Sequence, residues 1–375
     1  LTPETIEVPK NELDSALDLI GADLLRVIEK AAANIRAYHE KQLEKSWFTA
    51  SDDGIFLGQK ITPLSRVGVY APAGSAPLPS TVLMDAIPAK VAGVEEIILC
   101  SPPGKNGKVN PLILACAKLA DVDRVFMAGG AQAIAAMAYG TQTIPKVDKI
   151  VGPGNIYVAT AKKMVFGICG IDMIAGPSEI LIIADETANP AYVAADLLSQ
   201  AEHDKLASSI LLTTSRKLAE NVSKELETQM SRLTRKEIAM ESIENYGAVI
   251  VTDTINEAVD ISNTIAPEHL EVCTKNPFEL LPFIKNAGAI FLGNFSPEPL
   301  GDYFAGPNHT LPTSGTARFF SPLGVYDFVK RQSVISYSRD AFNAVASDVA
   351  AFAHAEGLTA HAEAILIRQG DGFPV

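Results

Sequence analysis

The sequence alternates short apolar runs with helical segments over most of its length, and this alternation constrains the fold more than any other feature. A first block of this kind starts near residue 66. It predicts strands at 67–70, 96–100, 124–128 and 149–151, with helices at 81–92, 111–119 and 132–139 between them. Strand–helix–strand units of this length run their strands parallel, with the helices covering the faces of the sheet. The block therefore predicts an α/β lobe.

A second block repeats the pattern. It predicts strands at 180–184, 209–213, 248–252, 270–273 and 289–292, and helices at 190–202, 216–233, 255–265 and 278–286. Asn110–Pro111 and Asn189–Pro190 each place an N-cap residue before a proline at the first helical position, where the missing N–H is not needed. The two blocks predict an α/β protein with two Rossmann-like lobes, which bind ligands at the carboxyl ends of their strands.

Helical periodicity continues on both sides of these blocks. Apolar spacing predicts an amphipathic helix at 23–44, with His39 on its solvated surface, and a closing helical stretch at 339–367. The chain has 375 residues, more than one hydrophobic core usually serves, which also favours at least two packed units.

Charge and cysteine content narrow the classes of partner. The formal net charge is −13, the pI is near 5.0 and basic residues form no cluster, which argues against nucleic acid or an anionic membrane as a main partner. The uncharged run 125–145 could match a membrane span in length, but its glycine, glutamine and threonine residues favour a buried strand, loop and helix. Scattered cysteines and a start without a secretory pattern favour a reducing cytoplasm.

Gln200 and His203 lie three residues apart near the end of a predicted helix, so their side chains share one face. That spacing can present two ligands to a metal ion, and imidazole is a common zinc ligand, whereas glutamine is not. Glu202 and Asp204 lie beside them and leave the ligand set ambiguous. An exposed polar helix end is the alternative interpretation of the same residues.

Glu268 and His269 directly precede a predicted apolar strand. A carboxylate beside an imidazole can act as an acid–base pair, although a polar loop pair is the alternative. The position at the entrance of the strand, rather than at its carboxyl end, argues against a crevice site of the usual kind.

The remaining candidates are imidazole and carboxylate groups in two clusters, namely Asp302 and His309 within 301–310, and His354, Glu356 and His361. The glycines and proline of the first cluster allow a loop to approach a ligand closely, and an ordinary turn-rich connector is the alternative. Together with His203, the clusters supply enough groups for one mononuclear metal site, if the fold brings them together.

Two glycine-containing segments are candidates for nucleotide binding. Gly152-Pro-Gly154-Asn155 and Gly129-Gly130 each follow a predicted strand and open a helix, as a phosphate-binding loop does. Tyr157 occupies the place of the third glycine in a G-x-G-x-x-G pattern, and no P-loop motif occurs. The residues by themselves indicate an α/β enzyme and leave nucleotide and metal binding open.

Several of these segments resemble the histidinol dehydrogenases. The matching motifs lie at 66–81, 129–135, 151–157, 175–179, 197–203, 266–270, 301–312 and 356–361. They follow the family order from about Ile20 to the C-terminus, which is more specific than any single motif. The family usually carries an N-terminal arm of a few dozen residues before this point that helps dimer formation, so the dimer contacts stay open here.

The resemblance implies a fold, an activity and cofactors. We expect an intertwined cytoplasmic homodimer that oxidises L-histidinol through histidinaldehyde to L-histidine, with NAD and one zinc ion per subunit. Residues 1–70 with 180–325 would form the lobe that carries most of the zinc and substrate site, and 71–179 the NAD-binding lobe. Residues 326–375 would form a helical extension that contributes to the partner subunit's site.

The resemblance also implies a role for each candidate residue. The zinc ligands would be Gln200, His203, Asp302 and His361, and the NAD contacts Tyr70, Gln132 and Asn155. Ser178, His269, His309 and Glu356 would join the zinc ligands in holding the substrate, with Glu356 and His361 supplied by the partner subunit. His269 would take the hydroxyl proton of the alcohol, and Glu268 would activate water for the second oxidation. Zinc would act as a template that holds the substrate's nitrogens.

Three other functions fit parts of the sequence. A related dehydrogenase could use the same zinc and NAD for another small alcohol, such as a sulfonated diol. A zinc hydrolase would activate water with the metal and need no nicotinamide cofactor. A non-catalytic binding protein would keep its function without Glu268 or His269.

Overall fold

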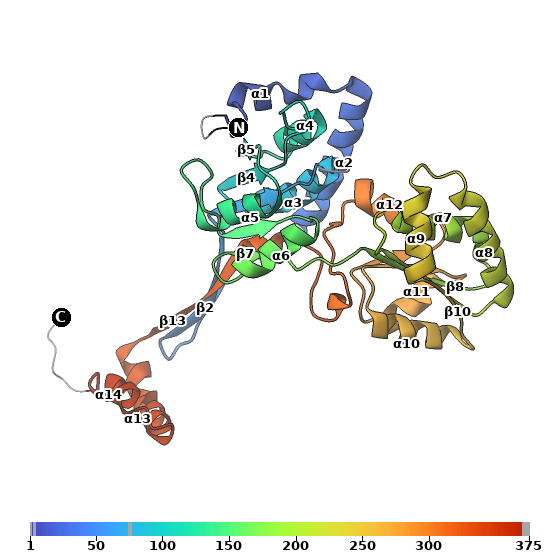
Figure 1. Ribbon diagram of the computed structural model, residues 1–375. Coiled ribbons are helices and arrows are strands. Elements are labelled where there is room, and N and C mark those ends of the chain that lie inside the picture. Colours follow the sequence, from blue (N-terminus) through green and yellow to red (C-terminus); the bar gives the residue numbers. More distant parts are fainter. Residues whose placement is uncertain (1, 3–4, 74–76, 370–375) are drawn as a thin grey trace. The chain divides into compact units, whose positions relative to one another are not determined.

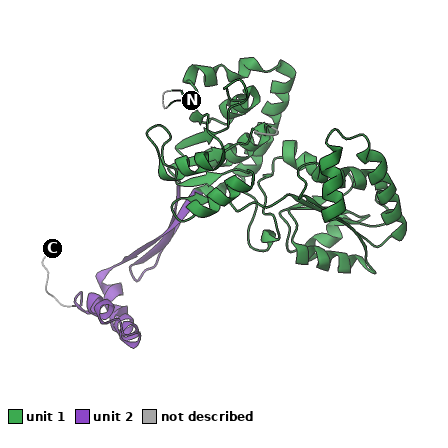
Figure 2. Ribbon diagram, in the orientation of Figure 1, with its two compact units in different colours: residues 1–43, 64–328 green, residues 44–63, 329–375 purple. Residues whose placement is uncertain are grey.

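The computed structural model describes residues 2, 5–73 and 77–369, and the chain divides into two compact units (Figures 1 and 2). Unit 1 comprises residues 1–43 and 64–328, and unit 2 comprises residues 44–63 and 329–375. Residues 74–76 of the 66–81 motif, and the outer ends of the expected division, lie outside the described residues.

The first sheet of unit 1 defines the β3 lobe. Its parallel strands are β3 (Arg66–Tyr70), β4 (Glu96–Cys100), β5 (Arg124–Phe126), β6 (Lys149–Val151) and β7 (Gly170–Ile171), in the order β5-β4-β3-β6-β7. The helices of the block are α3 (Pro79–Val91), α4 (Pro111–Leu119), α5 (Gly130–Tyr139) and α6 (Ile156–Val165). The predicted parallel α/β lobe is confirmed, because every strand pair in this sheet runs parallel.

The N-terminal segment packs on the β3 lobe. It contains α1 (Lys10–Asp14), η1 (Ala16–Leu19) and α2 (Ala22–Glu40), and its apolar residues join the core formed by α3, α4 and the sheet. The expected division is corrected here, since it grouped residues 1–70 with 180–325. Residues 66–70 form the central strand of the β3 sheet, and Val8, Leu13 and Ile35 belong to the same core as Val67.

The second sheet of unit 1 defines the β8 lobe. Its parallel strands are β8 (Glu179–Ala184), β9 (Ser208–Thr213), β10 (Gly247–Val251), β11 (His269–Cys273) and β12 (Ala289–Leu292), in the order β10-β9-β8-β11-β12. Around them lie α7 (Pro190–Ala201), α8 (Arg216–Met230), α9 (Lys236–Tyr246), α10 (Ile255–Ile265), α11 (Pro277–Leu280) and η2 (Leu281–Phe283). The helix predicted at 216–233 ends early, and α9 is a separate helix that the sequence pattern did not predict. The order of strands repeats that of the β3 sheet.

The segment that follows β12 contains short elements. They are α12 (Glu298–Leu300), the π-helical turn η3 (Gly301–Ala305), η4 (Thr316–Arg318) and η5 (Val325–Phe328). Leu323 and Phe328 return to the core of the β3 lobe. The chain therefore crosses from one lobe to the other between β12 and η5.

Unit 2 consists of an antiparallel sheet and two helices. The sheet has the order β1-β2-β13, with β1 (Trp47–Ala50), β2 (Ile55–Pro63) and β13 (Val329–Tyr337), and the helices are α13 (Arg339–Ala355) and α14 (Thr359–Leu366). The expected extension at 326–375 is thus not wholly helical, and it pairs with 44–63, which the sequence division placed in a lobe. Gly357, at φ +76°, lies between the two helices that replace the single predicted stretch.

Local predictions differ in outcome. Asn110 and Asn189 cap their helices as predicted, because each Oδ1 accepts a hydrogen bond from the backbone N–H two residues on, at 2.9 Å. The prediction for His39 is wrong, since the side chain is fully buried and continues the buried stripe of Ala31 and Ile35 on α2. No described helix has the length and apolar character needed to cross a membrane.

Candidate active site

The backbone N–H and carbonyl of Glu179 hold Glu268 and His269 in place. β11 begins at His269 and pairs with β8, with His269 opposite Ile180. The Glu179 N–H donates to Glu268 Oε2 at 2.9 Å, and the Glu179 carbonyl lies 3.0 Å from His269 Nδ1. A carbonyl only accepts hydrogen bonds, so Nδ1 carries the proton and Nε2 keeps its lone pair. The ring thus presents a proton acceptor in a fixed direction.

His269 Nε2 faces two carboxyl groups. It lies 4.0 Å from Glu298 Oε1 and 4.0 Å from Asp302 Oδ1. The ligand atoms of these three side chains all lie within 4.8 Å of one another, a spacing that can hold a metal ion. Both His269 Nε2 and Glu298 Oε1 are buried without a hydrogen-bond partner. A buried polar atom without a partner is costly, so these atoms indicate a place for a ligand.

Burial and mutual repulsion dominate the electrostatics of the site. Burial raises the pKa of Glu268 well above its usual value, and the charges of Asp302, Glu179 and Glu298 raise it further. Burial also raises the pKa of Glu298 and of Asp302, and burial lowers the pKa of His269 to about 4. Among the described residues, no lysine or arginine contributes to these shifts. A cation bound here would therefore relieve a concentrated negative charge.

Gln200 lies in the last turn of α7, and His203 lies in the turn that follows this helix. Gln200 is fully buried, and neither its amide oxygen nor its amide nitrogen has a hydrogen-bond partner. His203 is exposed, yet its charge contributes to the pKa values of Glu298 and His269. The structure thus brings His203 near Glu298 and His269, and it leaves the Gln200 amide free to bind a ligand.

His309 connects the site to α3. Its Nδ1 lies 3.2 Å from the Asp302 carbonyl and 4.0 Å from Asp302 Oδ1, and its Nε2 lies 3.4 Å from Thr81 Oγ1. Burial lowers the pKa of His309 to about 4, so its ring is neutral. Because the Asp302 carbonyl only accepts, Nδ1 carries the proton and Nε2 accepts from Thr81 Oγ1. Ser178, which is partly buried, lies immediately before β8 and so on the same edge of the sheet as Glu268 and His269.

Tyr70, Gln132 and Asn155 all lie at the carboxyl edge of the β3 sheet, one each from the segments that end β3, open α5 and open α6. The Tyr70 hydroxyl accepts a hydrogen bond from Gly130 N–H at 3.0 Å, which fixes the start of α5. Asn155 Oδ1 caps α6 by accepting from the backbone N–H groups of the second and third residues after it, at 3.1 and 3.2 Å. Gln132 and Asn155 are exposed at the edge where Rossmann-like sheets bind nucleotides.

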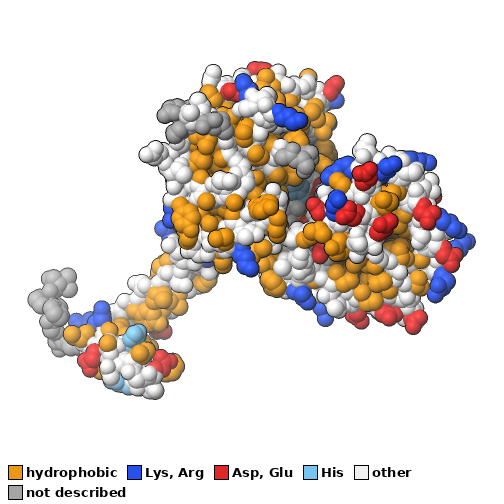
Figure 3. Space-filling view, in the orientation of Figure 1, with side chains coloured by type: hydrophobic (Ala, Val, Ile, Leu, Met, Phe, Trp, Pro, Cys, Tyr) orange, Lys and Arg blue, Asp and Glu red, His pale blue; other side chains and the backbone are white. Residues whose placement is uncertain are grey.

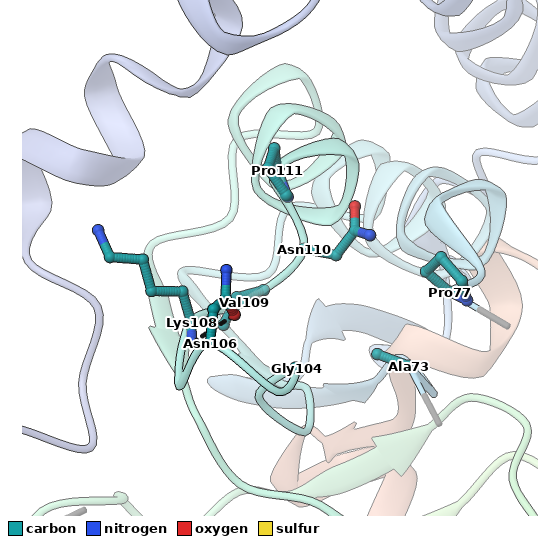
Figure 4. A pocket seen from close by; sticks show the side chains of 8 residues that line it. All are labelled: Ala73, Pro77, Gly104, Asn106, Lys108, Val109, Asn110 and Pro111. Carbon is teal, nitrogen blue, oxygen red and sulfur yellow. Dashed lines mark hydrogen bonds between the residues drawn. The ribbon is translucent and has the colours of Figure 1, made fainter. Parts of the chain in front are cut away.

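A pocket of about 140 Å³ lies beside this edge (Figure 4). Ala73 and Pro77 line it from the segment after β3, and residues of 104–111 line it from the loop after β4 and the start of α4. Figure 4 shows Asn110 at the start of α4, with the Lys108 side chain extending away from the helix. The carboxyl edge of the β3 sheet is therefore hollowed as well as exposed.

His354, Glu356 and His361 belong to unit 2. His354 lies in the last turn of α13, Glu356 is its C-cap and His361 lies in the first turn of α14. All three side chains are exposed in this unit. Gly357 lies in the turn between Glu356, which caps α13, and α14, which carries His361.

Comparisons with known proteins identify the family of the chain. A profile of histidinol dehydrogenase matches residues 1–369. The histidinol dehydrogenase of Aquifex aeolicus is 59% identical over 371 residues, which are 99% of this chain and 86% of that protein. The enzyme of Bacillus licheniformis is 61% identical over 96% of this chain and 84% of its own length. The chain belongs to the histidinol dehydrogenase family.

Solved structures agree with the family assignment. The crystal structure of histidinol dehydrogenase from Elizabethkingia anophelis superimposes with a TM-score of 0.92 and 42% identity, over 97% of this chain and 84% of that chain. An NAD-dependent aldehyde dehydrogenase from Sinorhizobium meliloti shares the fold, with a TM-score of 0.55 and 14% identity over 87% of this chain and 81% of that chain. The fold of the histidinol dehydrogenase family thus extends to proteins of low sequence identity.

Three site residues were not predicted from the sequence. Glu179 closes the 175–179 motif, but its role rests on its backbone, which sequence type does not reveal. Glu298 lies between two prolines, a pattern typical of a connector, although the side chain is 1% exposed. Thr81 is, with Asp85, one of two fully buried polar residues in the mostly apolar α3, and polar residues within such an apolar helix were a usable signal.

Proposed function

We propose that this protein oxidises L-histidinol through histidinaldehyde to L-histidine, using two NAD per turnover, in histidine biosynthesis. The observation that carries the proposal is the His269 imidazole, whose free Nε2 faces buried carboxyl groups while its Nδ1 is fixed by the Glu179 carbonyl. This arrangement suits removal of a proton beside a bound cation, and the family membership supplies the reaction.

The residues present fit zinc. We propose that Gln200, His203 and Asp302 hold the ion, together with His361 of the partner subunit. The unpartnered Gln200 amide and the uncompensated carboxyl groups support this set. A metal ion would give the amide oxygen a partner, and its divalent charge would compensate the carboxylates. When bound, zinc holds the substrate's imidazole and amino nitrogens, and NAD accepts the electron pair and proton released in each oxidation.

The first oxidation needs a base for the hydroxyl proton of histidinol. His269 Nε2 supplies it, because burial keeps the ring neutral and the Glu179 carbonyl keeps the proton on Nδ1. As the O–H bond breaks toward Nε2, the carbon loses hydride and the alcohol becomes an aldehyde. The β8–β11 pairing holds the ring rigidly, which preserves its direction during the step.

The second oxidation needs water added to the aldehyde. Glu268 accepts the proton of that water, and its raised pKa makes the carboxylate a stronger base than an ordinary one. The Glu179 N–H holds Oε2, which leaves Oε1 for the water. His269 returns the proton it took in the first oxidation to the carbonyl oxygen as water adds, which restores the free Nε2. It then takes the hydroxyl proton of the hydrated aldehyde as hydride leaves to a second NAD, and the product is the carboxylic acid. In this proposal, His269 therefore takes the hydroxyl proton in both oxidations, and Glu268 takes the proton of water in the second.

The remaining side chains bind substrate and cofactor in this proposal. Ser178, His269, His309 and Glu356 of the partner subunit hold histidinol together with the four zinc ligands. Tyr70, Gln132 and Asn155 contact NAD, so the β3 lobe binds the cofactor and the β8 lobe carries most of the zinc and substrate site. A homodimer follows from the need for residues of two subunits. A cytoplasmic location is supported by four cysteines that stay buried free thiols.

The test is NADH formation from L-histidinol by the purified protein, before chelation, after chelation and after zinc is restored. We expect two NADH per histidinol, loss on chelation and recovery with zinc. A protein that forms no NADH from histidinol but oxidises a sulfonated diol would overturn the substrate. Turnover without NAD would indicate a hydrolase, and unchanged function in a variant lacking Glu268 or His269 would indicate a binding protein.

A further inference from the structure

Three consecutive residues of the substrate-side loop, Asn308, His309 and Thr310, are attached to one face of α3. Asn308 Nδ2 donates to the Met84 carbonyl at 2.5 Å, and His309 Nε2 lies 3.4 Å from Thr81 Oγ1. Thr310 Oγ1 donates to Asp85 Oδ1 at 2.9 Å. Positions 81 and 85 are four residues apart and therefore share a helix face. The orientation of His309 thus depends on bonds to α3 on both sides of it.

The other oxygen of Asp85 faces the cofactor side. A side-chain carbon on Gly152 would lie 3.1 Å from Asp85 Oδ2, so this oxygen lies beside Gly152, the first residue of the 152–155 segment that opens α6. Gly152, at φ +115°, is held by Asp172 Oδ2, which accepts from its N–H at 2.8 Å, and by Lys162 Nζ, which donates to its carbonyl at 2.8 Å. Asp85 therefore lies next to Gly152, at the start of the segment that carries Asn155.

The position is a costly one for a carboxyl group. Asp85 is fully buried, its Oδ2 has no hydrogen-bond partner, and Lys162 forms its ion pair with Asp172 instead. Burial raises the pKa of Asp85 to about 8, and the charge of Asp172 adds to the shift. Its helix neighbours Met84, Ala86 and Ile87 are fully buried apolar residues. An apolar side chain at position 85 would therefore suit the stability of the core better than a carboxyl group.

We propose that Asp85 is a positioning residue that couples the Gly152–Asn155 segment to the Asn308–Thr310 loop, so that occupancy of the cofactor edge and of the substrate site are thermodynamically linked. The inference rests on the proposed function, which assigns NAD to the first segment and substrate to the second. Because coupling between two ligands is reciprocal, either ligand then alters the affinity for the other by the same factor.

The experiment measures NAD binding by calorimetry to the zinc-loaded protein, with and without saturating L-histidine. Histidine is the proposed product and cannot be oxidised further, so the two ligands can be present together. In the wild-type protein we expect histidine to change the Kd of NAD about 5-fold or more. Thr310→Val, which lacks the hydroxyl, brings this factor close to one and leaves the Kd of NAD alone unchanged. Thr310→Ser, which retains the donor, keeps the wild-type factor.

A double-variant cycle assigns the coupling to Asp85. If the link passes through its carboxyl group, Thr310→Val causes no further loss of coupling in an Asp85→Ala background. If Asp85→Ala fails to fold, the comparison of Thr310→Val with Thr310→Ser by itself tests whether the coupling passes through the Thr310 hydroxyl. No effect of histidine on NAD binding in the wild type, or undiminished coupling in Thr310→Val, overturns the inference. Failure of the proposed function is seen separately, as absence of NADH from histidinol with the wild-type protein.

Discussion

The β3 and β8 lobes share one topology but present their candidate functional groups on opposite edges. Both are five-stranded parallel sheets in which the first strand is central, and the second and third follow on one side. In the β3 lobe, Tyr70 and Asn155 lie at the carboxyl ends of strands. In the β8 lobe, Glu179 and Glu268–His269 lie at the amino ends of β8 and β11.

The difference shows that strand order does not determine which edge of a sheet carries the candidate groups. The carboxyl edge of the β3 lobe offers helix N-termini, which suit the phosphates of a nucleotide. The amino edge of the β8 lobe offers the end of α7, where Gln200 is buried. It also offers the backbone N–H and carbonyl of Glu179, which bind the side chains of Glu268 and His269. In the proposed function, the usual rule for ligand position therefore applies to one lobe and fails for the other.

The lobes also differ in surface character. Figure 3 shows acidic and basic side chains interspersed over the part that carries α8 and α9, while apolar side chains are more prominent over the part that carries α5 and α6. Ile156 and Tyr157 at the start of α6 are both 72% exposed, next to Asn155. An apolar surface beside a capped helix suits a cofactor that has rings as well as phosphates.

The largest expected effect lies at the amino edge of the β8 lobe. Asn in place of His269 keeps a donor for the Glu179 carbonyl but removes Nε2, the proton acceptor. We expect kcat for histidinol to fall by about 10³-fold, within the usual range for loss of a general base, while the KM for NAD stays constant. Steady-state kinetics with each substrate varied would check this. A raised KM for NAD with normal kcat would place the function of His269 at the cofactor instead.

The second prediction separates the two oxidations. Glu268→Gln keeps an acceptor for the Glu179 N–H but removes the base for water. We expect the rate with histidinaldehyde to fall by about 10²-fold, while the rate of the alcohol oxidation falls much less. Single-turnover measurements starting from the alcohol and from the aldehyde provide the comparison. Equal losses in both would mean that Glu268 serves the whole site rather than the water.

The third prediction tests the carboxyl edge of the β3 lobe. Asn155→Ala removes the cap of α6 and the proposed NAD contact, so we expect the KM for NAD to rise about 10-fold with little change in kcat. The matched control is Asn189→Ala, which removes the equivalent cap of α7 in the β8 lobe. Each should lower the free energy of unfolding by about 1 kcal/mol, but only the first should alter NAD binding. Similar KM values in the two variants would reduce Asn155 to a structural cap.

The lobes were predictable where the sequence pattern is local. Asn110–Pro111 and Asn189–Pro190 located the first residue of each helix, because caps and proline act within one turn. The strands of unit 2 were not predicted, since β2 and β13 have no buried residue, carry no clean alternation and pair across more than half of the chain. Pairing over such a separation leaves no local signature.

The site was predictable only in part, for a similar reason. Glu268 and His269 stood out as neighbours in sequence, yet their place at a strand entrance counted against them because the carboxyl edge was assumed. Glu298 and Thr81 act through contacts with distant segments and carry no motif of their own. His39 could have been found, since the spacing 31, 35 and 39 marks one buried stripe of α2.

The smallest expected effect concerns how the stability of the β3 lobe changes as the pH falls. His39 Nδ1 donates to Gln42 Oε1 at 2.8 Å, and its buried Nε2 has no partner, so protonation would add a buried N–H without an acceptor. Burial therefore lowers the pKa of His39 below 6.5. Its contribution to stability is complete above the unfolded pKa and declines as pH falls below 6.5, by at most about 1.4 kcal/mol per pH unit.

His39→Gln should remove this decline, so the wild-type advantage in thermal unfolding midpoint should shrink from pH 7.5 to pH 5. The exposed His354, changed to Gln, serves as the control and should leave the pH dependence unchanged. A constant difference between wild type and His39→Gln across this range would mean that the buried ring accepts a proton in the folded state as readily as in water.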